Sequence, residues 1–469
     1  MIGALVAAGD PAQLLPAREQ MAFTLGFHIL LVPFGVAFTL LMMVANWRGL
    51  RRNEPESLLL ARRWSKVAAV LFAVGAVSGT VLSFEMGLLW PGLMGRFGAA
   101  YGIPFAVEGI FFFLEAIFIA IYIYGWDRMS PWAHFWTGAP VVLSGAGGTA
   151  SVVAANSWMN LPGGVTVRGG RVVAVHPLQV FFSRPFWYEN LHMFLAAYIV
   201  AGFAVAAVYA VGLLRGRTDR YHRLGLLTGF VVAAIVTPAQ IIVGDAITRQ
   251  VYSNEPSKFA AIEILPHTTR VASETLGGIL IHGKVRYGVR IPDLASVLAG
   301  YSTKTRIKGL DAVGPRPADH LVTVVHWSFD VMVGIAFLLL ALAAWFALAW
   351  WRRHDIPRSR WFLRATAASG VLAAISLEAG WVVTEVGRQP WTVRGYLLTR
   401  DAVTRSGNVW WFFTFTLLIY LAVGYAAVRV LGSMRRRWRA DGVDPHVPYG
   451  PWQTLEHAVP PVPGSGADS

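Results

Sequence analysis

Two pairs of glutamates each lie in a strongly apolar stretch, with the members of a pair seven residues apart. Glu108 and Glu115 belong to GIPFAVEGIFFFLEAIFIAIYIYG, and Glu378 and Glu385 belong to ISLEAGWVVTEV. Seven residues make about two helical turns, so each pair is expected on one face of a helix. A buried carboxyl group without a partner tends to carry protons. Two such pairs therefore favour proton transfer or metal ligation over hydrogen bonding to neighbours alone.

Histidine and methionine extend this set. His28 and His192 lie well inside apolar stretches, and His326 lies near the start of another. A single buried histidine often makes only a hydrogen bond between helices. Neutral imidazole is also a favoured ligand of haem iron, and histidine with methionine is a known axial pair of an electron-transferring haem. Met332, which alone indicates core filling, is a candidate for that second ligand.

The elements that carry these residues are expected to be transmembrane helices. The chain has 469 residues, of which 55% are hydrophobic and 14% charged, and this composition excludes a soluble globular protein. A lipid-exposed backbone must satisfy its own hydrogen bonds, which favours helices, and the alternating pattern of an outer-membrane barrel is absent. Apolar stretches of roughly 20 residues, enough to cross the hydrocarbon core, occur at about 21–45, 67–90, 103–125, 133–157, 186–213, 224–247, 320–350, 361–385 and 408–431.

The predicted fold class is thus an all-α polytopic membrane protein with about nine transmembrane helices. The net charge of +14 comes largely from arginines at the span ends, near 48–63, 215–223, 352–360 and 435–439. If nine spans alternate, all four clusters face one side, which the positive-inside rule assigns to the cytoplasm. The N-terminus is then outside and the C-terminus cytoplasmic. The charge therefore does not indicate nucleic acid as a partner.

The spans and their connections divide the chain into four parts. Residues 1–249 hold helices one to six, 250–319 form one long external loop, 320–432 hold helices seven to nine, and 433–469 read as a disordered cytoplasmic tail. A loop as long as 250–319 is usually functional or disordered. Its apolar patches at 260–262 and 279–281 indicate partial order. The chain contains no cysteine, which excludes iron–sulfur clusters and cysteine-ligated haem.

The depths of the ionisable residues in their spans are similar. With a rise of about 1.5 Å per residue from the outer end, His28, Glu108 and His192 fall at comparable depths. Met332 is expected somewhat deeper and Glu385 close to the outer surface. These residues are therefore predicted to gather toward the outer leaflet, whereas Glu115 lies nearer the midplane.

The sequence resembles subunit I of the cytochrome bd quinol oxidases. The strongest signature is GRQPW at 387–391, preceded by EAGWVVTE on the same helix. Agreement continues in PFAVEGIFFFLE, in NSWMNLPGG at 156–164, in His28 with Arg18 ten residues before it, and in SKFAAIE at 257–263. The similarity covers residues 18 to about 432 and keeps the order of these motifs.

The resemblance implies that the chain carries three haems. His192 and Met332 match the ligands of a low-spin haem b. His28, Glu108 and Glu385 match the ligands of a high-spin haem b and a haem d, or of a third haem b in place of haem d. Which of these ligands serves which haem is left open.

Further residues around the haems follow from the same resemblance. Arg18 and Arg388 would bind haem propionates, because the guanidinium group suits a carboxylate. Trp381 and Trp391 would pack against the macrocycles. Asp330 stands where some members of the family have arginine, so the resemblance does not carry a propionate contact over to this position.

The long loop resembles the quinol-binding loop of the family in its short form. Lys258 and Glu263 occupy positions that interact with quinol, either menaquinol or ubiquinol, and a carboxylate is a suitable acceptor for a quinol proton. Glu115 matches a position on the proton path from the cytoplasm. Glu378 is expected in a haem pocket or on a proton exit.

The predicted function is that of a haem-containing subunit of a terminal quinol oxidase in the inner membrane of a prokaryote. It would oxidise quinol at the outer face and reduce O2 to water with cytoplasmic protons, generating proton motive force without pumping. The resemblance implies a second large subunit and admits small single-helix subunits. The alternative is a proton-coupled membrane transporter without haem, which the His and Met pair and the family motifs disfavour.

Overall fold

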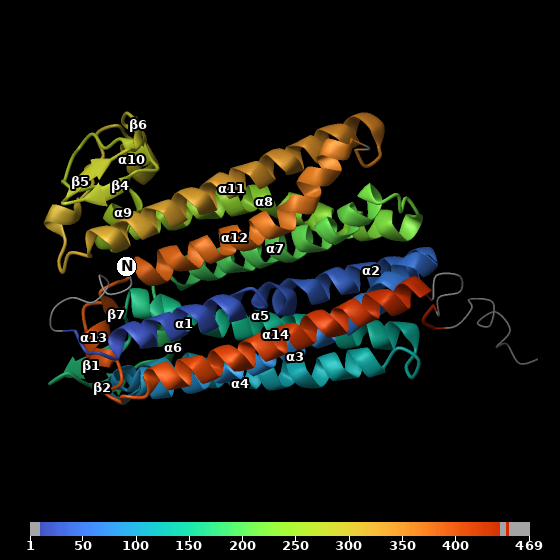
Figure 1. Cartoon of the computed structure of the whole chain (residues 1–469), viewed down its shortest axis with the longest axis horizontal. Coiled ribbons are helices and arrows are strands. Elements are labelled where there is room, and N and C mark those ends of the chain that lie inside the picture. Colours follow the sequence, from blue (N-terminus) through green and yellow to red (C-terminus); the bar gives the residue numbers. More distant parts are fainter. Residues whose placement is uncertain (1–9, 358, 441–446, 450–469) are drawn as a thin grey trace, which may run out of the picture.

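Long helices run side by side and form the body of the molecule (Figure 1). The computed structural model describes residues 10–357, 359–440 and 447–449. Within these residues, nine helical segments are long and apolar enough to cross a membrane, so the predicted all-α polytopic fold is confirmed. They are α1 (Leu14–Ile29) with α2 (Thr39–Arg52), α3 (Pro55–Leu89), α4 (Pro91–Tyr124), α5 (Pro131–Asn160), α7 (Phe186–Leu214), α8 (Arg220–Asn254), α11 (Asp319–Arg353), α12 (Arg360–Val386) and α14 (Val409–Ala440).

Local sequence explains where several of these helices begin. Pro55, Pro91 and Pro131 occupy the first turns of α3, α4 and α5, where a missing N–H costs nothing and the fixed φ angle suits a helix. Asp219 caps α8 by accepting a hydrogen bond from the backbone N–H of His222 at 3.0 Å. Such caps satisfy donors that would otherwise lack partners.

A short π-helix, η2 (Phe34–Phe38), interrupts the first span between α1 and α2. Pro33 precedes it and lacks the N–H that a regular helix would use. Irregular turns of this kind often occur at functional sites. A Cβ atom on Gly35 would lie 3.5 Å from Oε1 of Glu115, and one on Gly145 of α5 would lie 3.6 Å from it. Two glycines thus give the Glu115 carboxyl group room between the first span and α5.

The helices form two packed groups. In one group α7, α8, α11 and α12 contact each other, and in the other α1 to α5 and α14 do so, while α5 joins the two by packing on α7. The backbones of α7 and α8 approach closely. A Cβ atom on Gly202 would lie only 2.7 Å from the carbonyl oxygen of Gly229, so this position requires glycine. Small residues permit such close helix packing in membranes.

Short strands and helices gather at one end of the bundle, on the left of Figure 1, which we call the loop end. Three connections between spans form it. They contain the antiparallel pairs β1 (Val165–Arg168) with β2 (Arg171–Val175), β3 (Glu274–Leu276) with β6 (Val289–Ile291), β4 (Ile279–Ile281) with β5 (Lys284–Arg286), and β7 (Trp391–Val393) with β8 (Leu397–Leu398). They also contain α6 (Pro177–Phe181), α9 (Pro256–Ile262), α10 (Leu294–Gly300), the 3-10 turn η3 (Leu310–Ala312) and α13 (Thr399–Ala402).

The long connection between α8 and α11 is ordered, as its apolar patches predicted. Residues 259–262 are buried in a core that also contains Leu280 of β4 and Val322 of α11. The helix α8 continues to Asn254, past the boundary expected at residue 249, because Val251 in its last turn joins the same core. The loop is therefore a small packed unit seated on the ends of α8 and α11.

The opposite end of the bundle carries the arginine clusters, and we call it the arginine end. The helices α2, α11 and α14 finish there, with two arginines in the last turn of each. The helix α14 extends to Ala440, past the boundary expected at residue 432, because arginine is a good helix former and the first proline comes at 445.

Part of the predicted disordered tail packs against the bundle instead. The hydroxyl oxygen of Tyr449 lies 2.6 Å from Nδ1 of His134 on α5. Its ring centroid lies 5.4 Å from that of Trp126. An aromatic ring and a hydrogen bond thus anchor this short segment. The other tail residues predicted to be disordered, 441–446 and 450–469, lie outside the described residues.

Candidate functional site

A cavity of about 650 Å³ lies between the first span and helices α3, α4, α5 and α12. Its wall contains both acidic and basic groups although most of the lining is apolar. Eight residues that the sequence singled out contribute to this wall: Arg18, His28, Glu108, Glu115, Trp381, Glu385, Arg388 and Trp391. The structure therefore brings together groups that are up to 373 positions apart in the chain, counted from Arg18 to Trp391.

His28 is oriented by a hydrogen bond to α3. Its Nδ1 lies 2.8 Å from Oγ of Ser78, and that hydroxyl group donates its own hydrogen to the carbonyl oxygen of Gly75 at 3.0 Å. Ser78 must therefore accept from Nδ1–H, which leaves the lone pair of the ring on Nε2. A histidine held through one ring nitrogen in this way is suited to bind a metal through the other.

The carboxyl groups of α4 line the same cavity at two levels. Glu108 and Glu115 lie two turns apart on α4, and both contribute to the wall. Glu115 sits beside Gly35 and Gly145. The spacing of the pair therefore does place both acids on one face, as the sequence predicted.

Glu385 and Arg388 form an ion pair on the cavity wall. Nη2 of Arg388 donates to Oε2 of Glu385 at 2.6 Å, and Nη1 donates to Oδ1 of Asn156 at 3.0 Å. The guanidinium group is buried, and its Nε has no partner among the described residues. A positive charge with a free donor at the wall of a cavity suits an anionic ligand.

The remaining residues around GRQPW complete the wall at the loop end. Arg18 of α1 donates a hydrogen bond from Nη2 to Oε1 of Gln389, which also accepts from the hydroxyl of Thr399 at 3.0 Å. Trp381 contributes from α12, and Trp391 contributes from β7. The first span and the GRQPW turn are therefore joined through a side-chain hydrogen bond across the cavity wall.

His192 and Met332 lie outside this cavity, in the group formed by α7, α8, α11 and α12. The two ring nitrogens of His192 both lie 3.2 Å from Nε2 of Gln240 on α8. A Cβ on Gly380 of α12 would lie 3.1 Å from Sδ of Met332. Both side chains thus lie against neighbouring helices of one four-helix group, and the residue facing each is polar or small.

Glu378 is separate from both places. It lies on α12 opposite α1, where a Cβ on Gly26 would be 3.4 Å from its Oε2. Its Oε1 is buried without a hydrogen-bond partner among the described residues. The structure therefore does not join Glu378 to Glu385, although the two share one helix.

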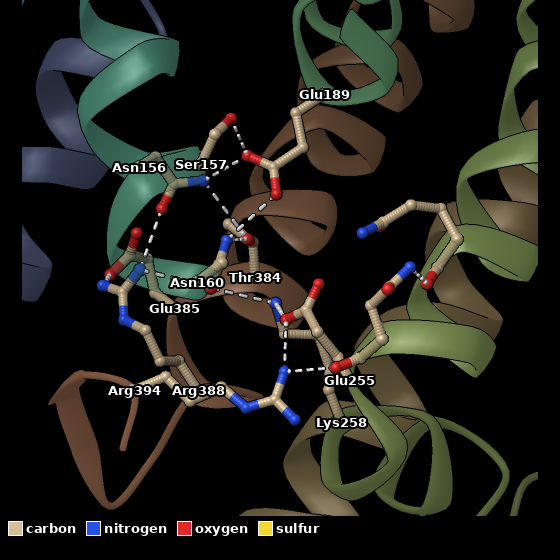
Figure 2. Close-up of polar contacts among 12 residues, drawn as sticks. Asn156, Ser157, Asn160, Glu189, Glu255, Lys258, Thr384, Glu385, Arg388 and Arg394 are labelled. Carbon is tan, nitrogen blue, oxygen red and sulfur yellow. Dashed lines mark hydrogen bonds and ion pairs between the residues drawn. The ribbon is translucent and has the colours of Figure 1, made fainter. Parts of the chain in front are cut away.

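Lys258 is buried in a polar network at the loop end (Figure 2). Its Nζ lies 2.6 Å from Oε2 of Glu255 and donates to Oδ1 of Asn160 at 3.0 Å. Oδ1 of Asn160 also accepts from Nη1 of Arg388 at 3.4 Å. One amide oxygen thus connects the lysine of the loop to the ion pair on the cavity wall.

The centre of this network is Glu189, an acid that was not among the residues predicted from the sequence. Its carboxylate accepts hydrogen bonds from Ser157 Oγ at 2.7 Å and from Nδ2 of Asn156 and Asn160 at 3.1 Å each. Figure 2 shows these side chains pointing toward it. Two features of the sequence could have indicated Glu189. It is an acid one helical turn before His192, and three polar residues, 156, 157 and 160, lie at the end of an apolar helix.

Glu263 is buried next to another loop carboxyl group, that of Glu274 on β3. The two side chains hydrogen-bond to each other. Burial raises the pKa of Glu263 well above its ordinary value, and the negative charges of Glu274 and Asp330 raise it further. The sequence marks Glu263 but not Glu274, because Glu274 stands eleven positions further along in an irregular segment.

The donor groups around the cavity fit haem. His28 offers a lone pair on Nε2, Glu108 and Glu385 offer carboxylates, and Arg18 and Arg388 offer guanidinium groups for anionic substituents. The unpartnered Nε of Arg388 is a further donor at this wall.

Comparisons with known proteins agree over almost the whole chain. The family model "Cytochrome bd terminal oxidase subunit I" matches residues 16–438. A putative cytochrome bd menaquinol oxidase subunit I from Bacillus subtilis (strain 168) is 31% identical over 428 residues, which cover 89% of this chain and 95% of the relative. Cytochrome bd-II ubiquinol oxidase subunit 1 from Escherichia coli (strain K12) is 25% identical over 457 residues, with 82% and 88% covered.

A solved structure shares the fold. The bd oxidase from Geobacillus thermodenitrificans contains a chain that is 32% identical and superposes with a TM-score of 0.84, covering 91% of this chain and 98% of that one. From the match of the family model together with this similarity, the chain belongs to the family of cytochrome bd terminal oxidase subunit I.

Proposed function

We propose that this chain holds the haems of a terminal quinol oxidase and that the cavity is the place where O2 is reduced. As a member of its family, the chain is a multi-pass membrane subunit of a quinol:oxygen oxidoreductase that uses haem, quinol, O2 and a second subunit. The observation that carries the proposal is the cavity wall, to which His28, Glu108 and Glu385 all contribute.

The side chains of the wall suit two closely spaced haems, a high-spin haem b and a haem d or a third haem b. His28, Glu108 and Glu385 would ligate them, and Trp381 and Trp391 would pack against them. Haem bound there would supply one-electron chemistry and the iron that reduces oxygen. Ser78 keeps the lone pair of His28 on Nε2, which is the form required of a ligand.

His192 and Met332 would hold a low-spin haem b in the second group of helices. Gly380 beside Met332 and Gly244, whose Cβ would lie 3.8 Å from Cε1 of His192, keep these two side chains unobstructed. Gln240 would orient the histidine ring from α8. The arrangement supports a ligand pair formed between neighbouring helices of one group.

Arg18 and Arg388 would bind the propionates. In the structure Nη2 of Arg388 is partnered by Glu385, while its Nε has no partner among the described residues and would be available to hold a propionate. An anionic partner there would also suit the buried positive charge of the guanidinium group.

Quinol would react at the loop end, where Glu263 accepts a proton and Lys258 orients the polar network. The buried position of Lys258 supports a role in holding the loop to Asn160 and the cavity wall rather than a role as a free cation. The subunit would lie in the cytoplasmic membrane of a prokaryote. The arginine end would then face the cytoplasm and the loop end the outside.

Protons for the formation of water would come from the arginine end past Glu115, while quinol protons leave at the loop end. Glu378 would keep a proton or a polar contact near α1. This separation stores energy without a pump, since each elementary charge moved across the membrane costs about 2.3 kcal/mol per 100 mV.

Spectroscopy of the purified two-subunit complex tests the proposal. The dithionite-reduced complex is expected to show haem α-bands, and a band near the red end of the spectrum would identify haem d. The complex is also expected to consume O2 when a quinol is added. A complex without α-bands would overturn the proposal and favour the alternative of a proton-coupled transporter without haem. His28→Ala is expected to remove one high-spin signal and leave the low-spin band.

A further inference from the structure

A cluster of ionisable groups lies where the long loop packs on α11, apart from the cavity. It contains Glu263 at the end of α9, Glu274 on β3, and His326 and Asp330 on α11. Glu263 is 2% exposed, Glu274 7% and His326 0%. Two acids and one histidine are thus removed from water, whereas the side chain of Asp330 is 16% exposed. Buried ionisable groups of this kind need partners for their charges.

His326 carries a positive charge in this arrangement. Its Nδ1 lies 2.6 Å from the carbonyl oxygen of Ile262, and its Nε2 lies 2.8 Å from that of Gly277. A carbonyl oxygen only accepts, so both ring nitrogens must carry hydrogen for these two contacts to be hydrogen bonds. Oδ2 of Asp330 lies 3.6 Å from Nε2 and balances the charge.

The same face of α11 fixes the position of Glu274. Asp330 accepts a hydrogen bond from the N–H of Gly277 at 2.6 Å, and Nε1 of Trp327 donates to the carbonyl oxygen of Gly278 at 2.7 Å. Gly277 and Gly278 have φ angles of +64° and +98°, which favour glycine. The turn after β3 is thus held at two points, and Glu274 is held beside Glu263.

The two glutamates share a proton. A hydrogen bond between two carboxyl groups exists only if one of them is protonated. The other oxygens, Oε2 of Glu263 and Oε2 of Glu274, are buried and have no hydrogen-bond partner among the described residues. Burial raises the pKa of both groups, and the imidazolium of His326 acts in the opposite direction on Glu274. The pair can therefore hold either one proton or two, and two of its oxygen atoms are available to accept hydrogen bonds.

We propose that Glu274 is the second carboxyl group of the quinol-oxidising site and that it shares with Glu263 the protons released by quinol. This inference rests on the proposed function. Oxidation breaks the two O–H bonds of quinol and yields quinone, two electrons and two protons. The electrons are consumed by the oxidase reaction, whose final acceptor is O2. The pair accepts the first proton and releases it to water at the loop end. It then accepts and releases the second proton in the same way.

A second carboxyl group solves a specific difficulty of a buried base. A lone buried carboxylate would be costly to leave charged between turnovers. A pair that holds one proton spreads a single negative charge over two groups and can still accept another proton. His326 and Asp330 face the pair from α11, with Nε2 of His326 and Oδ2 of Asp330 3.6 Å apart.

The test compares the purified two-subunit oxidase with its Glu274→Gln variant, using reduced ubiquinone-1 and reduced menadione as quinols. In the variant the charge of Glu274 no longer acts on Glu263, although that of Asp330 remains, so Glu263 loses its proton more readily. The acidic limb of kcat/KM against pH is expected to move down by about one pH unit. The maximum is expected to fall about tenfold, because the proton has only one carboxyl group to occupy.

Asp401→Asn is the matched control, since Asp401 is an exposed acid in α13 at the same end of the molecule. It is expected to leave the limb and the maximum unchanged. If Glu274→Gln lowers kcat/KM equally at every pH and the limb stays in place, Glu274 is only a packing residue and the inference is wrong. If the unmodified oxidase fails to oxidise either quinol, the proposed function itself is wrong.

Infrared spectroscopy covers the case in which Glu274→Gln does not assemble. Reduction of the unmodified oxidase with quinol is expected to change a carboxylic-acid C=O band that shifts in D2O. Glu274→Asp keeps the acid but shortens it, so this band is expected to change frequency. Identical carboxylic-acid bands in the two proteins would overturn the inference.

Discussion

Nζ of Lys258 lies 3.0 Å from Oδ1 of Asn160, and this contact joins the long loop to the end of α5. The same oxygen accepts from Arg388 at 3.4 Å. The amide nitrogen of Asn160 donates to Glu189 at 3.1 Å. A single side chain therefore connects a loop lysine, a cavity arginine and a buried carboxylate.

Replacement of Asn160 tests this connection. Asn160→Ala removes an acceptor from two cations and a donor from Glu189, and buried groups left without partners cost about 1–3 kcal/mol each. We expect a lower melting temperature of the oxidase and a higher KM for quinol. Gln179→Ala, at an exposed position of α6 at the same end of the molecule, is the control and should change neither. An unchanged melting temperature in Asn160→Ala would show that the network contributes no stability.

The ring of His28 has little space beside α3. A Cβ on Gly79 would lie 3.1 Å from its Cε1, so Gly79→Ala must displace the ring. We expect a shifted or weakened high-spin haem band in the reduced spectrum and an unchanged low-spin band. Gly87→Ala on the same helix is the control, because a Cβ there meets nothing within 4 Å. Equal spectra of the two variants would argue against His28 as a ligand.

Glu115 is predicted to deliver protons rather than to hold a cofactor. Glu115→Gln keeps the size of the side chain but cannot carry a proton, so O2 consumption is expected to fall about 100-fold. The reduced spectrum is expected to stay unchanged. Glu56→Gln, an acid in the first turn of α3, serves as the control. Loss of a haem band in Glu115→Gln would instead assign this residue to ligation.

The arginine end offers a prediction about pH. Burial alone would raise the pKa of Glu54, but hydrogen bonds from Arg48 and Ser57 and the charge of Arg220 hold that pKa below its ordinary value. A carboxyl group with a lowered pKa stabilises the fold above its unfolded pKa of about 4.3. That stabilisation is lost as the pH falls through the folded pKa.

Glu54→Gln is therefore expected to destabilise the oxidase by about 1–3 kcal/mol at neutral pH. The difference in melting temperature from the unmodified protein should shrink as the pH is lowered below about 4. Asp127 pairs with Arg62 at the surface, and Asp127→Asn is expected to have a smaller effect at every pH. A difference for Glu54→Gln that grows toward acid pH would contradict this account.

Much of the architecture follows from the sequence because its cause is local. The nine spans could be predicted from hydropathy and length, and the structure extends them at most of their ends, the furthest at the starts of α3 (residue 55 against 67 expected) and α4 (residue 91 against 103 expected). The spacing of Glu108 and Glu115 also sufficed to place both acids on one face of α4, since a helix repeats every 3.6 residues.

The tertiary structure decided the contacts between distant segments, which no local pattern encodes. The sequence marked Arg388, Lys258 and Glu263, but only the packed chain pairs Arg388 with Glu385 and Asn156, buries Lys258 against Asn160, and sets Glu274 beside Glu263. Glu189 was overlooked because its partners stand at least 29 positions away. Hydropathy and helical period therefore determined which residues enter the membrane, and packing determined which of their polar groups meet.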